Sequence, residues 1–277
     1  MRLGGPTFQK NPDPASWIIE LQQFGYRAAY CPIDETANAR TVNTFEQAAH
    51  DAGIVIAEVG VWNNPLSLDE VERRRAIELC QQKLALADAI GACCCVNISG
   101  SRGELWDGPH PHNYSDDTFD LIVETTRRII DAVRPTRTFF TLETMPWMLP
   151  DSVDSYLDLL RAIDRPRFAA HLDPVNLINS PRLYSQNSVL LKDCFERLGP
   201  YIKSCHVKDI TLGTGLTVHL SEVRAGLGGL DHVTFLRELN RLDPDTPIML
   251  EHLPTADDYL AAAEHLRAIA QAENITL

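Results

Sequence analysis

Four residues of the kinds that bind metal ions or transfer protons follow one another in the second half of the chain. They are Glu143, Asp173, His206 and Glu251, separated by 30, 33 and 45 residues, each at or near the end of a short apolar segment. Three carboxylates and an imidazole brought together in a dry interior would repel one another and lose their hydration. A divalent cation removes that conflict, and oxygen-rich ligation with one nitrogen favours Mn²⁺, Mg²⁺ or Co²⁺. The four residues therefore predict a metal site, provided that the fold brings them together.

The elements that would position these residues are eight apolar segments with strand character, each followed by a segment with helical periodicity. The strand segments are 1–8, 26–33, 54–62, 92–100, 138–145, 167–175, 202–210 and 247–253. Strands that alternate with helices form a parallel sheet. Eight such units in 277 residues fit a single closed (β/α)8 TIM barrel that covers 1–277 as one domain. The carboxyl ends of barrel strands share one mouth, where Glu143, Asp173, His206 and Glu251 would meet.

An open, doubly wound sheet is the alternative fold. Its first strand normally leads into a glycine-rich phosphate turn of the form G-x-G-x-x-G. The corresponding segment here, RLGGPTF, lacks that pattern, which favours the barrel. Helix boundaries are marked by residues suited to capping. The expected N-caps are Ser115, Asp151 or Ser152, Asp231 and Thr255, and Gly91 is an expected helix stop.

Charge, hydropathy and cysteine content indicate which binding partners and which cellular location to expect. The formal net charge of −13 argues against nucleic acid, which usually requires a basic surface. No apolar run reaches the length of a membrane span, and the first residues lack the apolar core of a signal peptide, so a cytoplasmic location is expected. The seven cysteines contain no Cys-x-x-Cys pair, and the three at 93–95 are adjacent. Reduced, structural thiols are expected rather than disulfides or a cysteine-bound metal.

Five short motifs resemble the xylose isomerase-like barrel superfamily, in particular its sugar isomerase and epimerase group with the ketose 3-epimerases. The motifs are LET, HLDPVNL, CHVKD, GLGGLD and MLEH, and the resemblance covers essentially the whole chain. It implies one divalent ion held by Glu143, Asp173, His206 and Glu251, with Mn²⁺ expected first and Mg²⁺, Co²⁺ or Zn²⁺ as alternatives. It also implies that Glu143 and Glu251 act as an acid–base pair on opposite faces of a substrate carbon. Barrels of this kind often form homo-oligomers, although no interface can be identified in the sequence.

The chemistry implied is enolisation of a carbohydrate. A metal ion would stabilise the charge of an enediolate while one carboxylate removes a proton beside the carbonyl and the other returns it. The leading hypothesis is therefore an isomerase or epimerase of a sugar or sugar-derived small molecule. A lyase or dehydratase of the inosose or keto-acid type would form the same enediolate and then expel a hydroxyl.

Two other functions are less favoured. The superfamily also contains apurinic-site endonucleases, but these use extra His ligands for a three-metal cluster, and the acidic charge of this chain disfavours DNA. A non-catalytic, metal-dependent sugar-binding protein is disfavoured by the complete acid–base pair. The 3-epimerases commonly have a His three residues after the metal Asp and an Arg several residues after the metal His. Asn176 and Lys208 depart from this pattern.

Further residues are candidates for substrate binding because they follow the expected strands. They are Asn176, Lys208, Trp62, Trp106, Trp147 and His112. Lys208 has an alternative role in an ion pair with Asp209, the tryptophans as ordinary core or surface residues, and His112 as a solvated loop residue. His171 shares the strand parity of Asp173, which places it one layer deeper in the barrel as a minor candidate for an extra ligand.

Overall fold

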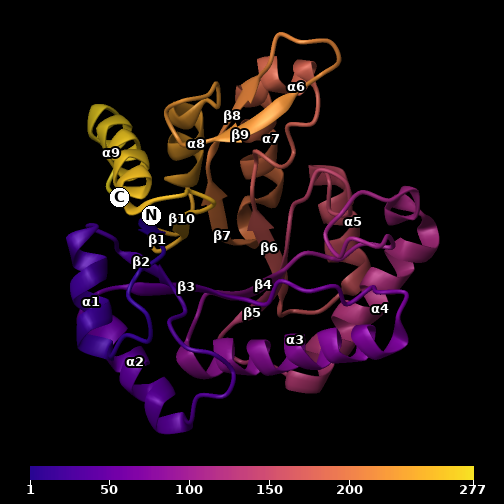
Figure 1. Cartoon of the computed structure of the whole chain (residues 1–277), viewed down its shortest axis with the longest axis horizontal. Coiled ribbons are helices and arrows are strands. Elements are labelled where there is room, and N and C mark those ends of the chain that lie inside the picture. The colour runs from indigo at the N-terminus through magenta and orange to yellow at the C-terminus, as the bar shows by residue number, and fades with distance from the viewer.

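The computed structural model describes residues 1–277 and contains eight parallel strands closed into a barrel (Figure 1). In their order around the ring the strands are β1 (Arg2–Gly5), β10 (Pro247–Leu250), β7 (Ile202–Val207), β6 (Phe168–Leu172), β5 (Phe139–Glu143), β4 (Cys94–Asn97), β3 (Val55–Gly60) and β2 (Ala28–Tyr30). Each strand lies within one of the eight segments expected from the sequence. The expected (β/α)8 barrel is therefore confirmed.

Helices surround the barrel, and their ends follow the capping residues in the sequence (Figure 1). The helices are α1 (Pro14–Gln23), α2 (Ala39–Asp51), α3 (Glu70–Ile90), α4 (Asp116–Val133), α5 (Val153–Ile163), α6 (Pro181–Ser185), α7 (Asn187–Leu198), α8 (His232–Leu239) and α9 (Ala256–Ala272), with short 3₁₀ turns at Pro111–Tyr114 and Gly199–Tyr201. Side chains of Ser115, Ser152, Asp231 and Thr255 accept backbone N–H groups at the starts of α4, α5, α8 and α9. Gly91 ends α3 at φ 74°, a left-handed conformation that glycine adopts without a steric penalty.

An antiparallel hairpin after β7 is absent from the sequence-based expectation. Its strands are β8 (Asp209–Leu212) and β9 (Leu220–Val223), and Figure 1 shows the hairpin projecting from the barrel near the top of the view. The segment 202–210 therefore contains two elements rather than one strand. The Asp209 carboxylate accepts the backbone N–H groups of Gly226, Gly228 and Leu230 and so fixes the loop that follows β9. This insertion accounts for the longer interval between His206 and Glu251.

The seven cysteines are free thiols, as expected. Cys94 and Cys95 in β4 are fully buried, where burial holds the pKa of each thiol well above its ordinary value. A buried thiol that keeps its proton is a weak nucleophile, so these residues act as small apolar side chains in the barrel wall. None of the helices carries an apolar stretch that would span a lipid bilayer.

Candidate active site

The four residues singled out by type and spacing meet at the carboxyl end of the barrel. Glu143 is the last residue of β5, Asp173 and Glu251 directly follow β6 and β10, and His206 lies in β7. One potential ligand atom from each lies within 4.8 Å of the others, and all four side chains are buried. The order of strands in the ring brings residues that are far apart in the sequence to one point.

An imidazole and an ammonium bind the three carboxylates together. His206 Nδ1 lies 3.0 Å from Glu143 Oε1 and 2.9 Å from Glu251 Oε2. Lys208 Nζ lies 2.8 Å from Asp173 Oδ2 and 2.6 Å from Glu251 Oε1. Lys208 is only 2% exposed, so its ammonium is part of the buried charge cluster and does not pair with its neighbour Asp209.

Burial and the neighbouring charges shift the pKa values of His206 and Glu251 in opposite directions. Burial would lower the pKa of His206, but the carboxylates of Glu251 and Glu58 outweigh it and raise the pKa well above its ordinary value. Burial would raise the pKa of Glu251, but His206 and Lys208 outweigh it and hold the pKa well below its ordinary value.

Asp173 contacts the same ammonium as Glu251, but its pKa is shifted in the opposite direction. Burial raises its pKa to about 6, although Lys208 alone would lower it. The two carboxyl groups differ because Glu251 also faces the imidazole of His206, whereas Asp173 lies near two other carboxylates, Glu143 and Glu251. The positive charge near Asp173 therefore does not offset the effects of burial and of the two neighbouring carboxylates.

The residues present fit a divalent metal ion. Asp173 Oδ2 and Glu251 Oε1 are buried and touch the Lys208 ammonium, yet neither makes a hydrogen bond with acceptable geometry. Such oxygens retain lone pairs for a cation. Three carboxylates and one imidazole nitrogen form a ligand set that suits Mn²⁺ or Mg²⁺, and burial makes their mutual repulsion costly without one. No cysteine lies in this group.

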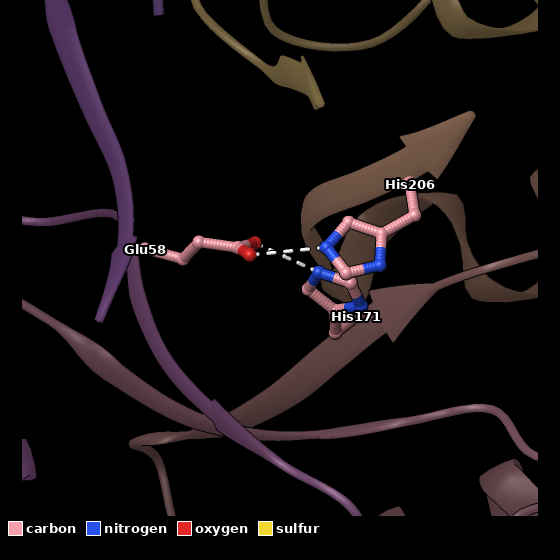
Figure 2. A group of neighbouring side chains, drawn as sticks. All are labelled: Glu58, His171 and His206. Atoms are coloured by element: carbon pink, nitrogen blue, oxygen red, sulfur yellow. Dashed lines mark hydrogen bonds and ion pairs between the residues drawn. The ribbon is translucent and has the colours of Figure 1, made fainter. Parts of the chain in front are cut away.

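A second group of buried polar residues, drawn in Figure 2, shares His206 with the first. Glu58 from β3 contacts His206 Nε2 with one oxygen, at 3.0 Å, and His171 Nε2 with the other, at 2.8 Å. His171 thus lies one layer deeper, as its strand parity indicates, and bonds to Glu58. Glu58 is missing from the sequence-based candidates, although a lone Glu inside the apolar segment IVIAEVGVW is a readable signal.

A cavity of about 380 Å³ opens above the cluster, within the usual range for small-molecule sites. Trp62 and Trp106 line it together with Glu143, Glu251 and His206. Six further lining residues are not among the candidates predicted from the sequence. They are Tyr30, Ile98, Asp107, Met145, His252 and Tyr259. A larger and more open depression between α1 and α2 contains none of the candidate residues.

Four candidate substrate-binding residues lie outside the cavity lining, and one of them is Lys208, which is buried in the charge cluster. Trp147 is half-exposed, and its Nε1 donates a hydrogen bond of 2.6 Å to the backbone oxygen of Asp107, so it supports a lining residue. His112 is exposed on a 3₁₀ turn beside His110. Asn176 Nδ2 donates to the backbone oxygen of Thr144 at 3.1 Å, which holds the loop next to Glu143.

His252 is a further polar residue of the lining that sequence reasoning missed. It follows Glu251 and adopts φ 56°, an uncommon conformation for a residue other than glycine. Its Nδ1 lies 3.3 Å from both Glu222 and Lys208 Nζ. Contact with the Glu222 carboxylate raises the pKa of His252. The β8–β9 hairpin, which carries Glu222, thus forms part of the site's surroundings.

Comparisons with known proteins agree with this architecture. The D-psicose 3-epimerase of Clostridium cellulolyticum H10, solved with D-tagatose, has a TM-score of 0.70 at 13% identity and covers 100% of both chains. The probable 3-DHS dehydratase AsbF of Bacillus anthracis has a TM-score of 0.70 at 17% identity, covering 98% of this chain and 99% of its own. A xylose isomerase-like TIM barrel protein of Mycobacterium smegmatis, in complex with magnesium, has a TM-score of 0.68 at 14% identity, with 98% and 95% covered.

At these identities the structural likeness shows the fold alone. No curated protein sequence matches the chain closely enough to count as a relative. The sequence model of one family does match, over residues 19–269, and its description agrees with the closed barrel seen here. The chain belongs to the xylose isomerase-like TIM barrel family.

Proposed function

We propose that this protein is a divalent-metal-dependent isomerase or epimerase of a sugar or a sugar-derived ketone. The observation that carries the proposal is the convergence of Glu143, Asp173, His206 and Glu251 at the carboxyl end of the barrel, where Glu143, His206 and Glu251 line one cavity. Solved structures with this fold include enzymes described as D-psicose 3-epimerase and 3-keto-D-glucoside 4-epimerase.

Glu143 and Glu251 are the acid–base pair in this proposal. Both line the cavity, and their strands β5 and β10 are separated in the ring by β6 and β7, so they approach from different sides. One carboxylate would remove the proton from the carbon beside a carbonyl, and the other would return a proton to the opposite face. A divalent ion bound by the four residues, with Mn²⁺ the first expectation, would supply Lewis-acid polarisation of the carbonyl.

The cavity walls favour a neutral carbohydrate as the substrate. Tyr30, Trp62, Trp106 and Tyr259 offer aromatic surface against which the apolar C–H faces of a sugar can pack. Asp107 and His252 offer polar groups for hydroxyls. We infer that Lys208, which is buried behind the lining and touches both Asp173 and Glu251, positions these two carboxylates.

A dehydratase is the second candidate, favoured by one specific contact. His252 lines the cavity, and its Nε2 lies 3.5 Å from Glu251 Oε2, so a group able to donate a proton stands beside Glu251. After proton removal, the His252 imidazolium would protonate a departing hydroxyl in place of reprotonation at carbon. The probable dehydratase of Bacillus anthracis shares the fold to the same degree as the epimerase.

Product analysis on a substrate panel separates the two candidates. The protein would be stripped with EDTA, reloaded with Mn²⁺, Mg²⁺ or Co²⁺, and incubated with ketoses, keto-acids and inososes. We expect conversion that requires the metal and is lost on removing it, giving an isomer of equal mass for an epimerase and loss of water for a dehydratase. Turnover that survives complete metal removal would contradict both candidates.

A further inference from the structure

Both ring nitrogens of His206 contact carboxylates. Its Nδ1 faces Glu143 and Glu251 in the four-residue cluster, and its Nε2 lies 3.0 Å from Glu58 Oε1. Figure 2 shows Glu58 reaching from its strand toward the rings of His206 and His171. Glu58, His171 and His206 are at most 1% exposed, so water does not compete for these contacts.

We propose that Glu58 is a positioning residue for the metal site, which accepts the Nε2–H of His206 and thereby leaves Nδ1 free to bind the ion. The inference rests on the metal ion of the proposed function. It adds a residue from the opposite side of the barrel, β3, that belongs to neither the ligand set nor the cavity lining. Glu58 would act on the metal only through His206.

Carboxylates face both ring nitrogens of His206, and a carboxylate only accepts hydrogen bonds, so without a metal ion both nitrogens are donors. A metal ion bound beside Glu143 and Glu251 would displace the proton on Nδ1. The proton on Nε2 would remain in its hydrogen bond to Glu58 Oε1. Histidines that bind metals commonly donate their second ring N–H to a carboxylate, which sets both the tautomer and the ring orientation.

Glu58 is itself held firmly enough to orient another residue. Its second oxygen, Oε2, accepts hydrogen bonds from His171 Nε2 at 2.8 Å and from Ser204 Oγ at 3.0 Å. His171 and Ser204 are paired across β6 and β7, and His206 lies two residues after Ser204 on the same strand. The carboxylate is therefore fixed by donors on two strands. A Glu so placed cannot turn away from His206 without leaving buried donors unpaired.

The same three residues could instead be read as a second metal site, and the contacts favour hydrogen bonding. Each imidazole already pairs with a different oxygen of Glu58, at distances normal for N–H···O bonds. Ser204, a hydroxyl donor, completes the set. Neither Glu58 nor His171 lines the cavity through which an ion would enter. The number of ions bound per chain distinguishes the two interpretations.

The test is calorimetric titration of the EDTA-treated full chain with Mn²⁺. We compare the wild type with Glu58→Gln, and use Glu46→Gln as the matched control, because it makes the same change at a carboxylate on α2 that pairs with Arg137 and contacts neither polar group. We expect one ion per chain, a Kd raised by about 10- to 100-fold in Glu58→Gln, and a Kd near the wild-type value in Glu46→Gln. Circular dichroism melts check that each variant is folded.

Three results would overturn the proposal in different ways. Wild-type affinity in folded Glu58→Gln would remove Glu58 from the metal site while leaving the proposed function intact. Two ions in the wild type and one in Glu58→Gln would make the group of Glu58, His171 and His206 a second metal site. No Mn²⁺ binding by the wild type would refute the metal of the proposed function itself.

A spectroscopic measurement covers the case in which Glu58→Gln does not fold. Nitrogen-15 NMR of the Mg²⁺-loaded wild type, labelled at histidine, reports which ring nitrogen of His206 is protonated. We expect the proton on Nε2. A proton on Nδ1, with Nε2 bare, would contradict the role of Glu58 whatever the variants do.

Discussion

The ammonium of Lys208 lies 2.6 Å from Glu251 Oε1, the shortest ion pair among the buried residues of the site. The same nitrogen lies 2.8 Å from Asp173 Oδ2. A positive charge therefore already stands among the carboxylates that we assign to the metal ion. This ammonium and a divalent ion would stabilise the same oxygens, so the two cations are linked energetically.

Replacing Lys208 should make the protein more dependent on metal. Lys208→Met leaves Asp173 and Glu251 buried beside each other without the ammonium, and removing one partner of a buried ion pair typically costs about 3–5 kcal/mol. We expect a lower free energy of unfolding without metal, and a larger rise in Tm on adding Mn²⁺ than in the wild type. Denaturant and thermal unfolding with and without Mn²⁺ measure both. An equal rise in Tm in the two proteins would separate Lys208 from the metal site.

Metal affinity should increase with pH. Both Asp173, whose pKa is raised to about 6, and His206, whose pKa is raised above its ordinary value of 6.5, hold protons that a metal ion must displace. The Kd for Mn²⁺ should therefore fall as the pH rises through about 6 and on past 6.5, by about tenfold per unit for each proton displaced. Glu251, whose pKa is lowered, contributes no such proton.

Calorimetry in two buffers with different ionisation enthalpies counts the protons directly. The expected result is a net release of protons on binding Mn²⁺ near neutral pH. Binding with no proton release and no pH dependence would show that His206 and Asp173 do not bind the ion.

The three tryptophans near the mouth should differ in their effect on substrate binding. Trp62 and Trp106 line the cavity, whereas Trp147 does not. Trp62→Ala and Trp106→Ala should raise the KM of the substrate found in the panel, by about tenfold for the loss of one aromatic contact. Trp147→Ala, the matched control, should have a smaller effect. Steady-state kinetics provide the comparison, and equal KM values for all three variants would argue against the cavity as the substrate site.

One stability prediction concerns the packing of α5 on the barrel. The hydroxyl of Tyr156 bonds to the backbone oxygens of Leu142 in β5 and Ala169 in β6 and accepts the N–H of His171. The residue is fully buried. Tyr156→Phe should lower the free energy of unfolding by about 1–3 kcal/mol, because it leaves these backbone groups unpaired. Urea unfolding measures the change, and a loss well below 1 kcal/mol would mean that the bonds are dispensable.

The barrel and the meeting of its four polar strand ends could be predicted from the sequence for a physical reason. A closed parallel barrel directs the carboxyl end of each strand to the same mouth, so a polar residue at that end is placed by topology alone. Glu143, Asp173, His206 and Glu251 satisfy this condition. Helix starts such as Ser115 and Ser152 were equally readable, because capping depends only on local hydrogen bonds.

The remaining features depend on contacts that no local pattern specifies. Glu58 on β3 contacts His206 on β7 because the closed ring of strands places these two strands on opposite sides of one interior. The loop positions of His112 and Trp147 carry no periodicity, so the sequence could not show that they lie outside the cavity lining. The hairpin after β7 was hidden because β7 and β8 are separated only by Lys208.

Hydrogen exchange at the substrate carbon in D₂O, followed by proton NMR, tests the proposed acid–base roles of Glu143 and Glu251 most directly. The Mn²⁺-loaded protein is incubated with the panel of ketones, separated from the metal, and the loss of the proton signal beside the carbonyl is measured. We expect deuterium incorporation that requires metal and is abolished in both Glu143→Gln and Glu251→Gln. Product formed in D₂O without incorporation of solvent deuterium, or full exchange in either variant, would contradict these roles.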